Sequence, residues 1–370
     1  MAVTGLGAVT AFGAGVPALR QGAWSGATAI AEVTLFDVSR FVAKTAAEVR
    51  LVPDDPACET ADRTERLALA AANEALGPLA ALGPGAGVAV GTTLAGREAR
   101  EAPGSLAALL ARRYGALGPV ATVSTACASG AAAIGLASAW IREGRATRVL
   151  AGGADALSPF VFSGFDALRA LSPTAARPFD SGRDGLTLGE GAGFLLLEDE
   201  GAAVRRGARV LARVAGYGSA ADAFHMTRPD PAGSGLSRAS RAALADAGLA
   251  AADVGFVSAH GTGTVFNDAM EEAALAHVLG PRAGSVPVHG LKGAIGHTLG
   301  AAGALEAVLC VLVLGADDVP PTAGHRASRA DSPLRVVSGA PHRPARLVDV
   351  VLSTSAAFSG TDAALVLERA

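Results

Sequence analysis

Two pairs of chemically distinctive segments in this chain are separated by the same interval of 170 residues. The segment AVGTT at 89–93 corresponds to AHGTG at 259–263, and each follows an apolar, strand-like run. Cys127 in TACASGAAAIG and His297 in AIGHTLGAAGAL each open an alanine-rich, helix-like run, again 170 residues apart. Two matches at one offset indicate an internal repeat, which constrains the chain to two similar halves.

Strands and helices alternate through both halves, which is typical of an α/β fold with mostly parallel pairing. The segments VTGLGAV at 3–9 and VAGYGSA at 214–220 start the halves 211 residues apart, so the first half carries about 40 extra residues near its start. The charged stretch EDEGAAVRRGARV separates the halves. We therefore predict two domains, residues 1–205 and 206–370, and a closing hairpin whose turn lies at 359–362.

Cys127 lies between a strand-like and a helix-like segment. The run LGPVATV before it is apolar and β-branched, as in a buried strand, and GAAAIGLASAWIREG after it has helical spacing. Free backbone N–H groups and the positive end of the dipole at a helix N-terminus favour a thiolate over a thiol. The alternative is an inert buried cysteine that packs as a small hydrophobe.

Two histidines follow the same logic as Cys127. His260 and His297 each lie in a glycine-rich turn, where backbone approaches a ligand closely. Stacking two similar halves would gather both with Cys127, and a cysteine with two imidazoles suits acyl transfer. The remaining histidines are expected to be ordinary core or surface residues: His225, His277, His289, His325 and His342.

Composition excludes several other functions. Aromatic residues make up 4 % of the chain and the net charge is −3, so a nucleic-acid partner is not expected. Three scattered cysteines match neither a disulfide framework nor a zinc site and favour a reducing cytoplasm. The longest late apolar run contains Glu306 and is too short to span a bilayer, so no membrane association is expected.

The segments TACASG, SAHGTGT and LKGAIGHTLGAAGALE resemble the active-site motifs of the β-ketoacyl-acyl carrier protein synthases, condensing enzymes of the thiolase superfamily. Other signatures of the family appear in order, among them VTGLGAVT, AGGADA and RPFDSGRDGLTLGEGAGFLLLE. The resemblance implies the thiolase fold, two similar βαβ-type halves stacked as an α-β-α-β-α sandwich. It also implies an acyltransferase that acts on chains carried by the phosphopantetheine arm of an acyl carrier protein, without a bound cofactor or metal.

The resemblance assigns a role to each candidate residue. Cys127 attacks the acyl thioester, and the backbone N–H groups of Cys127 and Phe358 hold the oxyanion. His260 and His297 hold the thioester oxygen of malonyl-acyl carrier protein as carbon dioxide leaves. The resulting enolate attacks the acyl-Cys127 thioester and extends the chain by two carbons. Phe358 and Gly360 belong to the gate loop of the family.

Lys292 and Glu306 match a buried lysine of the family and its partner glutamate. An unpaired buried charge is costly, so we expect the two to be paired. On this interpretation they support and position His297. The alternative gives Lys292 a direct catalytic role in decarboxylation.

Three departures from the usual sequence of the family indicate which branch of the family this chain resembles. The stretch from Gly91 to Cys127 is shorter than in the fatty-acid elongating synthases, and the gate loop GFGGTN reads AAFSGTD, with Ala357 and Ser359 at glycine positions. A Cβ at these positions restricts positive φ, so we expect a loop that swings less easily. The segments 163–193 and 292–303 resemble synthases of type II polyketide and aryl-polyene-like pathways.

These features favour a ketosynthase that extends a polyketide or polyene chain. The alternatives are a housekeeping fatty-acid elongating synthase and a non-catalytic partner of the chain-length-factor type, although such partners typically lack the cysteine. In this fold an edge strand usually continues into a partner's sheet. We therefore expect a heterodimer with a chain-length-factor-like homologue, otherwise a homodimer, together with acyl carrier protein as a partner.

Overall fold

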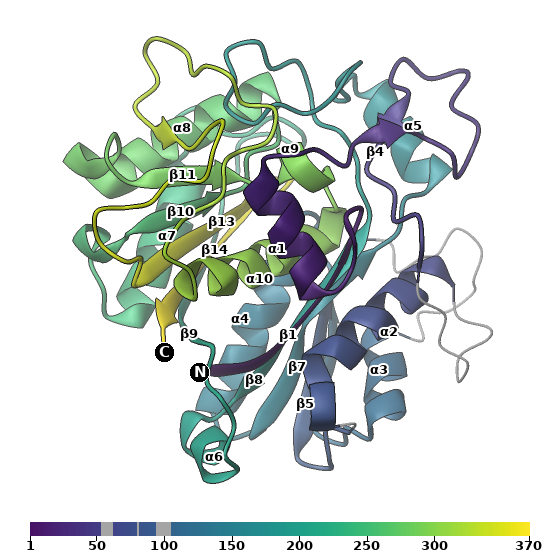
Figure 1. Ribbon diagram of the computed structural model, residues 1–370, viewed down its shortest axis with the longest axis vertical. Helices are drawn as coiled ribbons and strands as arrows, with labels where there is room; N and C mark the ends of the chain where they lie inside the picture. Colours follow the sequence, from purple (N-terminus) through teal and green to yellow (C-terminus); the bar gives the residue numbers. More distant parts are fainter. Residues whose placement is uncertain (53–61, 80, 94–104) are drawn as a thin grey trace.

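The computed structural model describes residues 1–52, 62–79, 81–93 and 105–370. Within these residues one hydrogen-bonded sheet has the strand order β12-β11-β10-β13-β14-β9-β1-β8-β7-β5-β6. The sheet consists of two blocks, because its central strands β1 and β9 share only the pairs Ala2 with Arg213 and Val3 with Ala212. Figure 1 shows the first block at the lower right and the second at the upper left.

The two blocks repeat one topology. In the first block β8 is antiparallel to both neighbours and β5 is parallel to both neighbours. In the second block β14 is likewise antiparallel to both neighbours, and β10 is parallel to both neighbours. The strands of the first block are β1 (Ala2–Thr10), β8 (Gly191–Glu198), β7 (Arg148–Asp155), β5 (Ala86–Gly91) and β6 (Val120–Val123). Those of the second are β9 (Ala212–Ala221), β14 (Thr361–Arg369), β13 (Val350–Ala356), β10 (Phe256–Ala259), β11 (Pro287–Gly290) and β12 (Arg335–Val336).

The observed topology corrects the prediction of mostly parallel pairing. Each block is mixed, because its inner strands form antiparallel pairs and its outer strands form parallel ones. A short connection permits antiparallel neighbours, and β13 and β14 are joined by such a hairpin, with a turn at 357–360 rather than 359–362. The 170-residue offset is present in the strands themselves, since β5 begins at Ala86 and β10 at Phe256.

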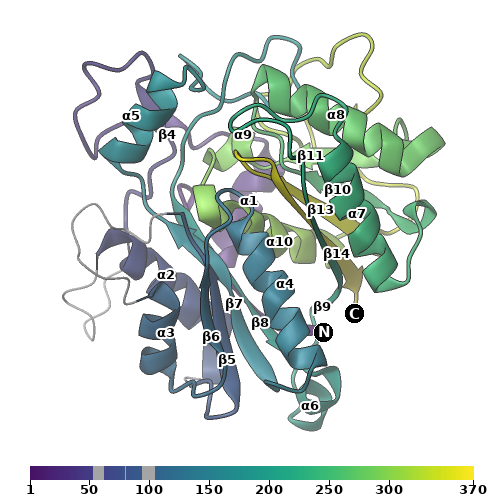
Figure 2. The same ribbon diagram turned by 180° about the vertical axis from the view of Figure 1, so that it is seen from behind.

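Helices cover both blocks of the sheet and also fill the space between the blocks (Figure 2). α2 (Arg63–Leu76) and α3 (Leu106–Tyr114) pack on the first block, and α7 (Ser234–Ala247) packs on the second with α8 (Val265–Leu279) beside it. α4 (Ser129–Arg142) and α10 (Ala302–Leu314) contact each other between the blocks. The α-β-α-β-α sandwich implied by the sequence is therefore confirmed.

The central helices approach each other closely because small residues line the crossing. A Cβ added at Gly130 of α4 would lie 2.8 Å from the backbone of Ala304, and one at Gly303 of α10 would lie 2.9 Å from the backbone of Ala131. α10 is buried over almost its whole length, as its sequence, apolar on all sides except for Glu306, requires. The crossing brings the beginning of α4 close to the segment that precedes α10.

Shorter elements complete the chain. They are β2 (Gly13–Ala14), α1 (Val16–Ser25), β3 (Ala31–Glu32), β4 (Thr45–Ala46), η2 (Gly77–Leu79), α5 (Pro159–Ala167), α6 (Glu200–Arg205), η3 (Ala251–Asp253), η4 (Gly280–Arg282), α9 (Lys292–Ile295) and η5 (Leu299–Ala301). The predicted extra residues of the first half correspond to the stretch between β1 and α2, which contains α1, β3 and β4. No helix in the described part of the chain is both long and apolar enough to cross a membrane.

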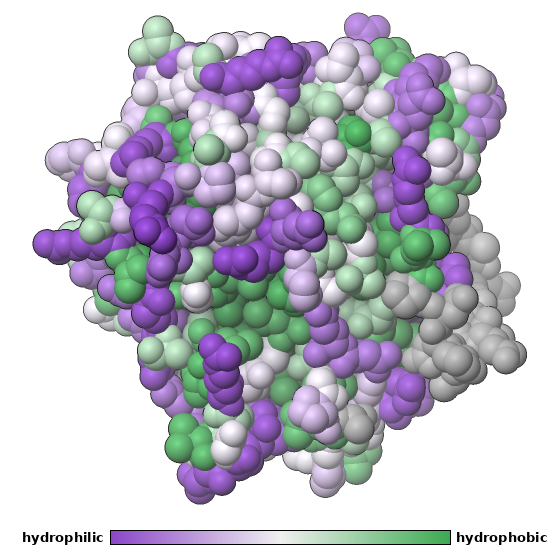
Figure 3. Space-filling model, in the orientation of Figure 1, coloured by the Kyte–Doolittle hydropathy of each residue, from purple (hydrophilic) through white to green (hydrophobic). Residues whose placement is uncertain are grey.

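The surface is mixed in character. Figure 3 shows apolar side chains gathered in the middle of the viewed face, over α10 and β1, with hydrophilic side chains around the edge. At the outer end of the first block, β6 is an edge strand whose Val120 is 40 % exposed. The sequence predicted a buried strand here, and this difference arises because, within the described part of the chain, β6 pairs only with β5.

Candidate active site

Cys127 lies in a tight turn between β6 and α4, two residues before the first helical residue Ser129. The side-chain oxygen of Ser129 accepts a hydrogen bond from the Thr125 N–H (2.9 Å) and donates one to the Ala126 carbonyl (2.6 Å). Ala126 has a positive φ of 51°, a left-handed conformation that costs a residue with a Cβ about 1–2 kcal/mol. The predicted strand-to-helix setting of Cys127 is therefore present, and its turn is strained.

The thiol of Cys127 is buried, with 6 % of the residue exposed. Burial raises the pKa of this thiol to about 11, against the opposing effects of the Lys292 charge and of the backbone N–H groups of Phe358 and Cys127. The helix terminus alone would favour a thiolate, but desolvation by burial opposes it and is the largest cause of this shift. The two N–H groups expected to form the oxyanion hole do face the sulfur.

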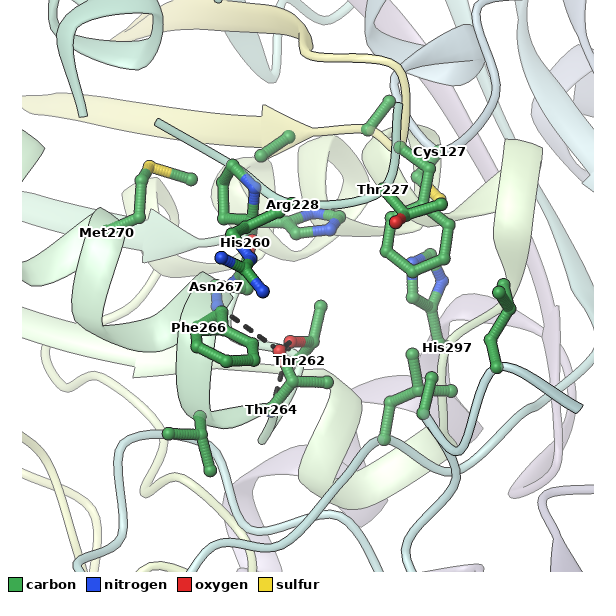
Figure 4. A pocket seen from close by; sticks show the side chains of 18 of the residues that line it. Cys127, Thr227, Arg228, His260, Thr262, Thr264, Phe266, Asn267, Met270 and His297 are labelled. Atoms are coloured by element: carbon green, nitrogen blue, oxygen red, sulfur yellow. Dashed lines mark hydrogen bonds between the residues drawn. The ribbon is translucent and has the colours of Figure 1, made fainter. Parts of the chain in front are cut away.

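His260 and His297 lie in the same cavity as Cys127, which has a volume of about 310 Å³ (Figure 4). His260 follows β10, and His297 lies between α9 and η5. Their ring centroids are 5.2 Å apart at an interplanar angle of 81°, and both residues are buried. The structure thus brings together the three residues singled out from the sequence.

Hydrogen bonds determine which nitrogen of each ring carries the proton. The Nδ1 atom of His297 accepts the Leu299 N–H at 3.1 Å. The Nδ1 atom of His260 lies 3.2 Å from the Nζ atom of Lys292, and an ammonium group can only donate. Burial lowers the pKa of both histidines well below the ordinary value, and the Lys292 charge lowers it further. Both rings are therefore neutral, and each has its proton on Nε2.

Lys292 and Glu306 form the expected buried ion pair. The Nζ atom of Lys292 also donates to the His260 carbonyl at 2.6 Å. The prediction that the pair supports His297 directly is thus corrected, because the lysine contacts His260 instead. Lys292 is not among the residues that line the cavity, which argues against direct contact with substrate. Burial raises the pKa of Glu306 to about 7, while Lys292 opposes this shift.

Two carboxylates of α8 organise the loop that carries His260, and neither was identified from the sequence. Glu271 accepts the N–H of His260 (2.7 Å) and of Gly261 (2.8 Å), and Asp268 accepts the N–H of Thr262 (3.1 Å). Burial raises the pKa of Glu271 to about 7. The sequence does contain a signal that could have identified them. Asp268 and Glu271 lie three residues apart in the first half of α8, a helix that directly follows the glycine-containing loop of His260.

Asp155 is a third buried carboxylate that the sequence did not single out. It accepts the Thr92 hydroxyl and the Gly300 N–H, each at 2.7 Å. It therefore connects the carboxyl ends of β5 and β7 to the segment just after His297.

The turn between β13 and β14 contains Phe358 and Gly360. The ring of Phe358 stacks on Phe165, with centroids 5.5 Å apart. Ser359 has a φ of 76°, so it adopts the left-handed conformation that glycine tolerates best, whereas Ala357 does not. The Ser359 N–H donates to the Met226 carbonyl at 2.6 Å, which attaches the turn to the segment after β9.

The other histidines and cysteines lie mostly away from this site. His225 is the exception, because it lines the cavity and was expected to be an ordinary core or surface residue. Its Nδ1 atom accepts the N–H groups of Thr227 (3.1 Å) and Arg228 (3.2 Å). Cys310 is a free, buried thiol in α10, whereas Cys58 and part of the shortened stretch between Gly91 and Cys127 lie outside the described residues.

Comparison with known families gives two adjoining matches. Residues 1–203 match the N-terminal domain of β-ketoacyl synthases, and residues 211–326 match their C-terminal domain. Among curated proteins, the chain is 36 % identical to the tetracenomycin polyketide synthase ketoacyl synthase alpha subunit of Streptomyces glaucescens, covering 99 % of this chain and 96 % of that protein. It is 34 % identical to 3-oxoacyl-[acyl-carrier-protein] synthase 2 of Coxiella burnetii, covering 99 % of this chain and 98 % of that protein.

Solved structures give the same result. The ishigamide ketosynthase/chain length factor superposes with a TM-score of 0.91 at 34 % identity, covering 100 % of this chain and 98 % of the other. A second structure, AntDE:AntF, contains a type II polyketide synthase acyl carrier protein in complex with its ketosynthase bound to the hexaketide. It gives a TM-score of 0.90 at 31 % identity, covering 100 % of this chain and 98 % of the other.

Proposed function

The chain belongs to the β-ketoacyl synthase family of condensing acyltransferases, and on this basis we propose that it extends a polyketide or polyene chain by two carbons. The acyl chain would be held on Cys127 and the extender unit on acyl carrier protein. The observation that carries the proposal is the pair of neutral histidines, each with a proton on Nε2, beside a buried thiol.

Acyl transfer to Cys127 comes first. The sulfur attacks the thioester carbonyl carbon, and the backbone N–H groups of Cys127 and Phe358 hold the oxyanion. Collapse of this intermediate breaks the bond to the phosphopantetheine sulfur, which leaves with the proton that the Cys127 thiol has lost. Because both histidines donate from Nε2, neither is prepared to take up this proton as a base.

Condensation follows in the same cavity. The thioester oxygen of malonyl-acyl carrier protein would accept hydrogen bonds from the Nε2–H groups of His260 and His297. The bond between the malonyl methylene carbon and the carboxylate breaks, and carbon dioxide leaves. The electron pair of that bond forms the enolate, which the two donors stabilise. The enolate carbon then attacks the acyl-Cys127 carbonyl, and the cysteine sulfur leaves as a thiolate that takes a proton from solvent. Lys292 and Glu306 are positioning residues that keep His260 in its donor tautomer.

A polyketide or polyene product is favoured over fatty-acid elongation by the identities to curated relatives. The chain is 36 % identical to the alpha subunit from Streptomyces glaucescens and 34 % identical to 3-oxoacyl-[acyl-carrier-protein] synthase 2 of Coxiella burnetii, so the second function remains the alternative. The two alignments cover 412 and 407 positions, more than the 370 residues of this chain, so both relatives have residues without a counterpart here. A partner chain would then supply part of the pocket wall.

We propose that this partner binds along β6. Among the described residues the outer side of this strand is unpaired; Val120 at its start is 40 % exposed, and Leu117 just before it is 80 % exposed. Such an edge exposes backbone groups that another sheet can pair with. One similar structure contains a ketosynthase with a chain length factor, and another contains a ketosynthase with its acyl carrier protein. A heterodimer with a chain-length-factor-like homologue is therefore favoured, with a homodimer as the alternative.

The test is reconstitution with an acyl-acyl carrier protein as acyl donor and malonyl-acyl carrier protein as extender, followed by mass spectrometry of the protein and of carrier-bound products. The protein is assayed alone and together with a chain-length-factor-like homologue, and Cys127→Ala is the matched control. We expect an acyl adduct at Cys127, and elongation mainly by the pair. Absence of the adduct would contradict the assignment of the nucleophile. Full elongation of saturated chains by the protein alone would favour fatty-acid synthesis and a homodimer.

A further inference from the structure

We propose that Asp222 and Asp362 share one proton, and that this proton holds the turn carrying Phe358 closed over the cavity. The proposal deepens the proposed function, because it concerns access to Cys127. Asp362 lies at the start of β14, directly after the turn. Asp222 lies just after β9, and its N–H donates to the carbonyl of Gly360 in the turn. Both line the same cavity as Cys127.

The two carboxyl groups face each other without a donor between them. The Oδ1 atom of Asp222 and the Oδ2 atom of Asp362 are both buried, and among the described residues neither accepts a hydrogen bond from an N–H or hydroxyl donor. A Cβ built on Gly235 would lie 2.2 Å from the first oxygen and 2.4 Å from the second, so both oxygens lie above the first turn of α7. Two ionised carboxylates only accept hydrogen bonds and repel each other, whereas one shared proton turns the contact into an O–H···O bond.

The surrounding charges favour retention of this proton. Asp362 faces Asp222, Glu271 of α8 and Arg238 of α7, and the arginine opposes the effect of the negative groups. The Arg238 guanidinium donates to the Ala221 carbonyl at 2.8 Å. Burial, then the charge of Asp222 and its hydrogen bond, raise the pKa of Asp362 to about 8. The pair therefore holds its proton at neutral pH and loses it in mildly alkaline solution.

Asp230 also faces the pair, but its carboxylate is engaged elsewhere. Its N–H donates to the Oδ2 atom of Asp222 at 2.9 Å, and its own carboxylate accepts the Ser234 hydroxyl. The hydrogen bond from Ser234 lowers the pKa of Asp230. Asp230 therefore adds negative charge near the pair and does not compete for the shared proton.

Closure of the turn depends on this contact. Two backbone hydrogen bonds join the turn to the segment after β9: Asp222 N–H to the Gly360 carbonyl (2.7 Å) and Ser359 N–H to the Met226 carbonyl (2.6 Å). Ser359 is held in a left-handed conformation that costs about 1–2 kcal/mol. Loss of the proton would add charge repulsion to this strain. The turn would then move away with Phe358, whose N–H faces the sulfur of Cys127.

The chain itself suggests the diagnostic variant. The gate loop GFGGTN of the family ends in asparagine, where this chain has Asp362. In Asp362→Asn the amide N–H can donate to Asp222 without any shared proton. This variant should keep the turn closed at every pH, and Asp222→Asn should do the same from the other side. Asp317→Asn, at an exposed carboxylate 3.6 Å from Arg343, serves as the matched control.

The experiment compares alkylation of Cys127 by iodoacetamide and by the bulky reagent fluorescein maleimide between about pH 6.5 and about pH 9.5. Both reagents attack the thiolate, so the ratio of the two rate constants, measured on the Cys127 peptide by mass spectrometry, cancels the titration of the thiol. In the wild type and Asp317→Asn we expect a constant ratio at low pH. Above about pH 8 it should rise by up to about tenfold per pH unit. In both pair variants we expect a constant ratio.

A constant ratio in the wild type would overturn the proposal, as would a rise in Asp362→Asn equal to that of the wild type. A midpoint that moves when potassium is replaced by choline, or when a chelator is added, would mean that a cation bridges the pair instead of a proton. Alkylation requires no condensing activity. Failure of the proposed function therefore leaves this test interpretable.

Discussion

Replacing Lys292 by methionine tests whether a residue outside the cavity controls the chemistry inside it. The Nζ atom of Lys292 contacts a carboxylate oxygen of Glu306, the carbonyl of His260 and the Nδ1 atom of His260. Methionine retains most of the side-chain volume but provides no donor. Nδ1 of His260 then loses the partner that keeps the proton on Nε2, and Glu306 loses its cation.

The structure sets the size of both effects. Removing one member of a buried ion pair typically costs about 3–5 kcal/mol of stability. Without Lys292, protonation relieves the buried charge of Glu306, whose pKa burial already raises to about 7. A raised carboxyl pKa gives stability that is present at low pH and lost as pH rises through it, so Lys292→Met should be more stable at pH 6 than at pH 8. Decarboxylation of malonyl-acyl carrier protein should fall by about 10²-fold, as for loss of one oxyanion donor.

Three measurements separate the two effects. Urea unfolding gives the stability, carbon dioxide release gives decarboxylation, and intact mass gives acylation of Cys127, which should change little. The double variant Lys292→Met/Glu306→Met removes both charges and should recover stability without recovering decarboxylation. Arg142→Met, which removes a partly exposed ion pair with Asp246, should cost at most about 1 kcal/mol and leave activity unchanged. Normal decarboxylation by folded Lys292→Met would refute the positioning role of the lysine.

The remaining predictions concern the cavity and its turn. Cys127→Gln should decarboxylate malonyl-acyl carrier protein without condensing it, and loss of both activities in a folded variant would contradict the proposed division of roles. His260→Ala and His297→Ala should both suppress condensation in the reconstituted assay, while intact mass shows that Cys127 still acylates in at least one of them. Alkylation of wild-type Cys127 by iodoacetamide should accelerate about tenfold per pH unit up to about pH 10, because the raised pKa leaves few thiolates at neutral pH, and a plateau near pH 7 would contradict this. Ser359→Gly should raise the free energy of unfolding by up to about 1 kcal/mol in urea, since glycine adopts a φ of 76° without strain.

Local sequence patterns predicted the strand, turn and helix around Cys127 because these depend on residues close in the chain. They did not predict the protonation of the thiol, since burial of Cys127 depends on the Phe358 turn and on His297, which are distant in sequence. Desolvation is a property of the assembled cavity. It therefore reverses the effect that the helix terminus would have in solvent.

The partner of Lys292 was mispredicted for a topological reason. Lys292 is close to His297 in sequence, so support of that residue was the natural inference. However, β10 and β11 are parallel neighbours, and Ala259 pairs with Gly290. The residues just beyond these two strand ends therefore lie side by side, which places Lys292 against His260. Pairing of strands, rather than distance along the chain, decides the contact.

The 170-residue repeat predicted the site because it specifies where two equivalent helices begin. Cys127 precedes α4, His297 precedes α10 by way of η5, and the two helices pack together in the central layer. The crossing is close because Gly130 leaves room for the backbone of Gly300 and Ala304, and Gly130 and Gly300 are themselves 170 residues apart. The first half therefore supplies the cysteine, the second supplies both histidines, and each half supplies part of the packing that brings these groups together. The two positions differ in chemistry while the backbones around them correspond, so the active site exists only where the halves meet.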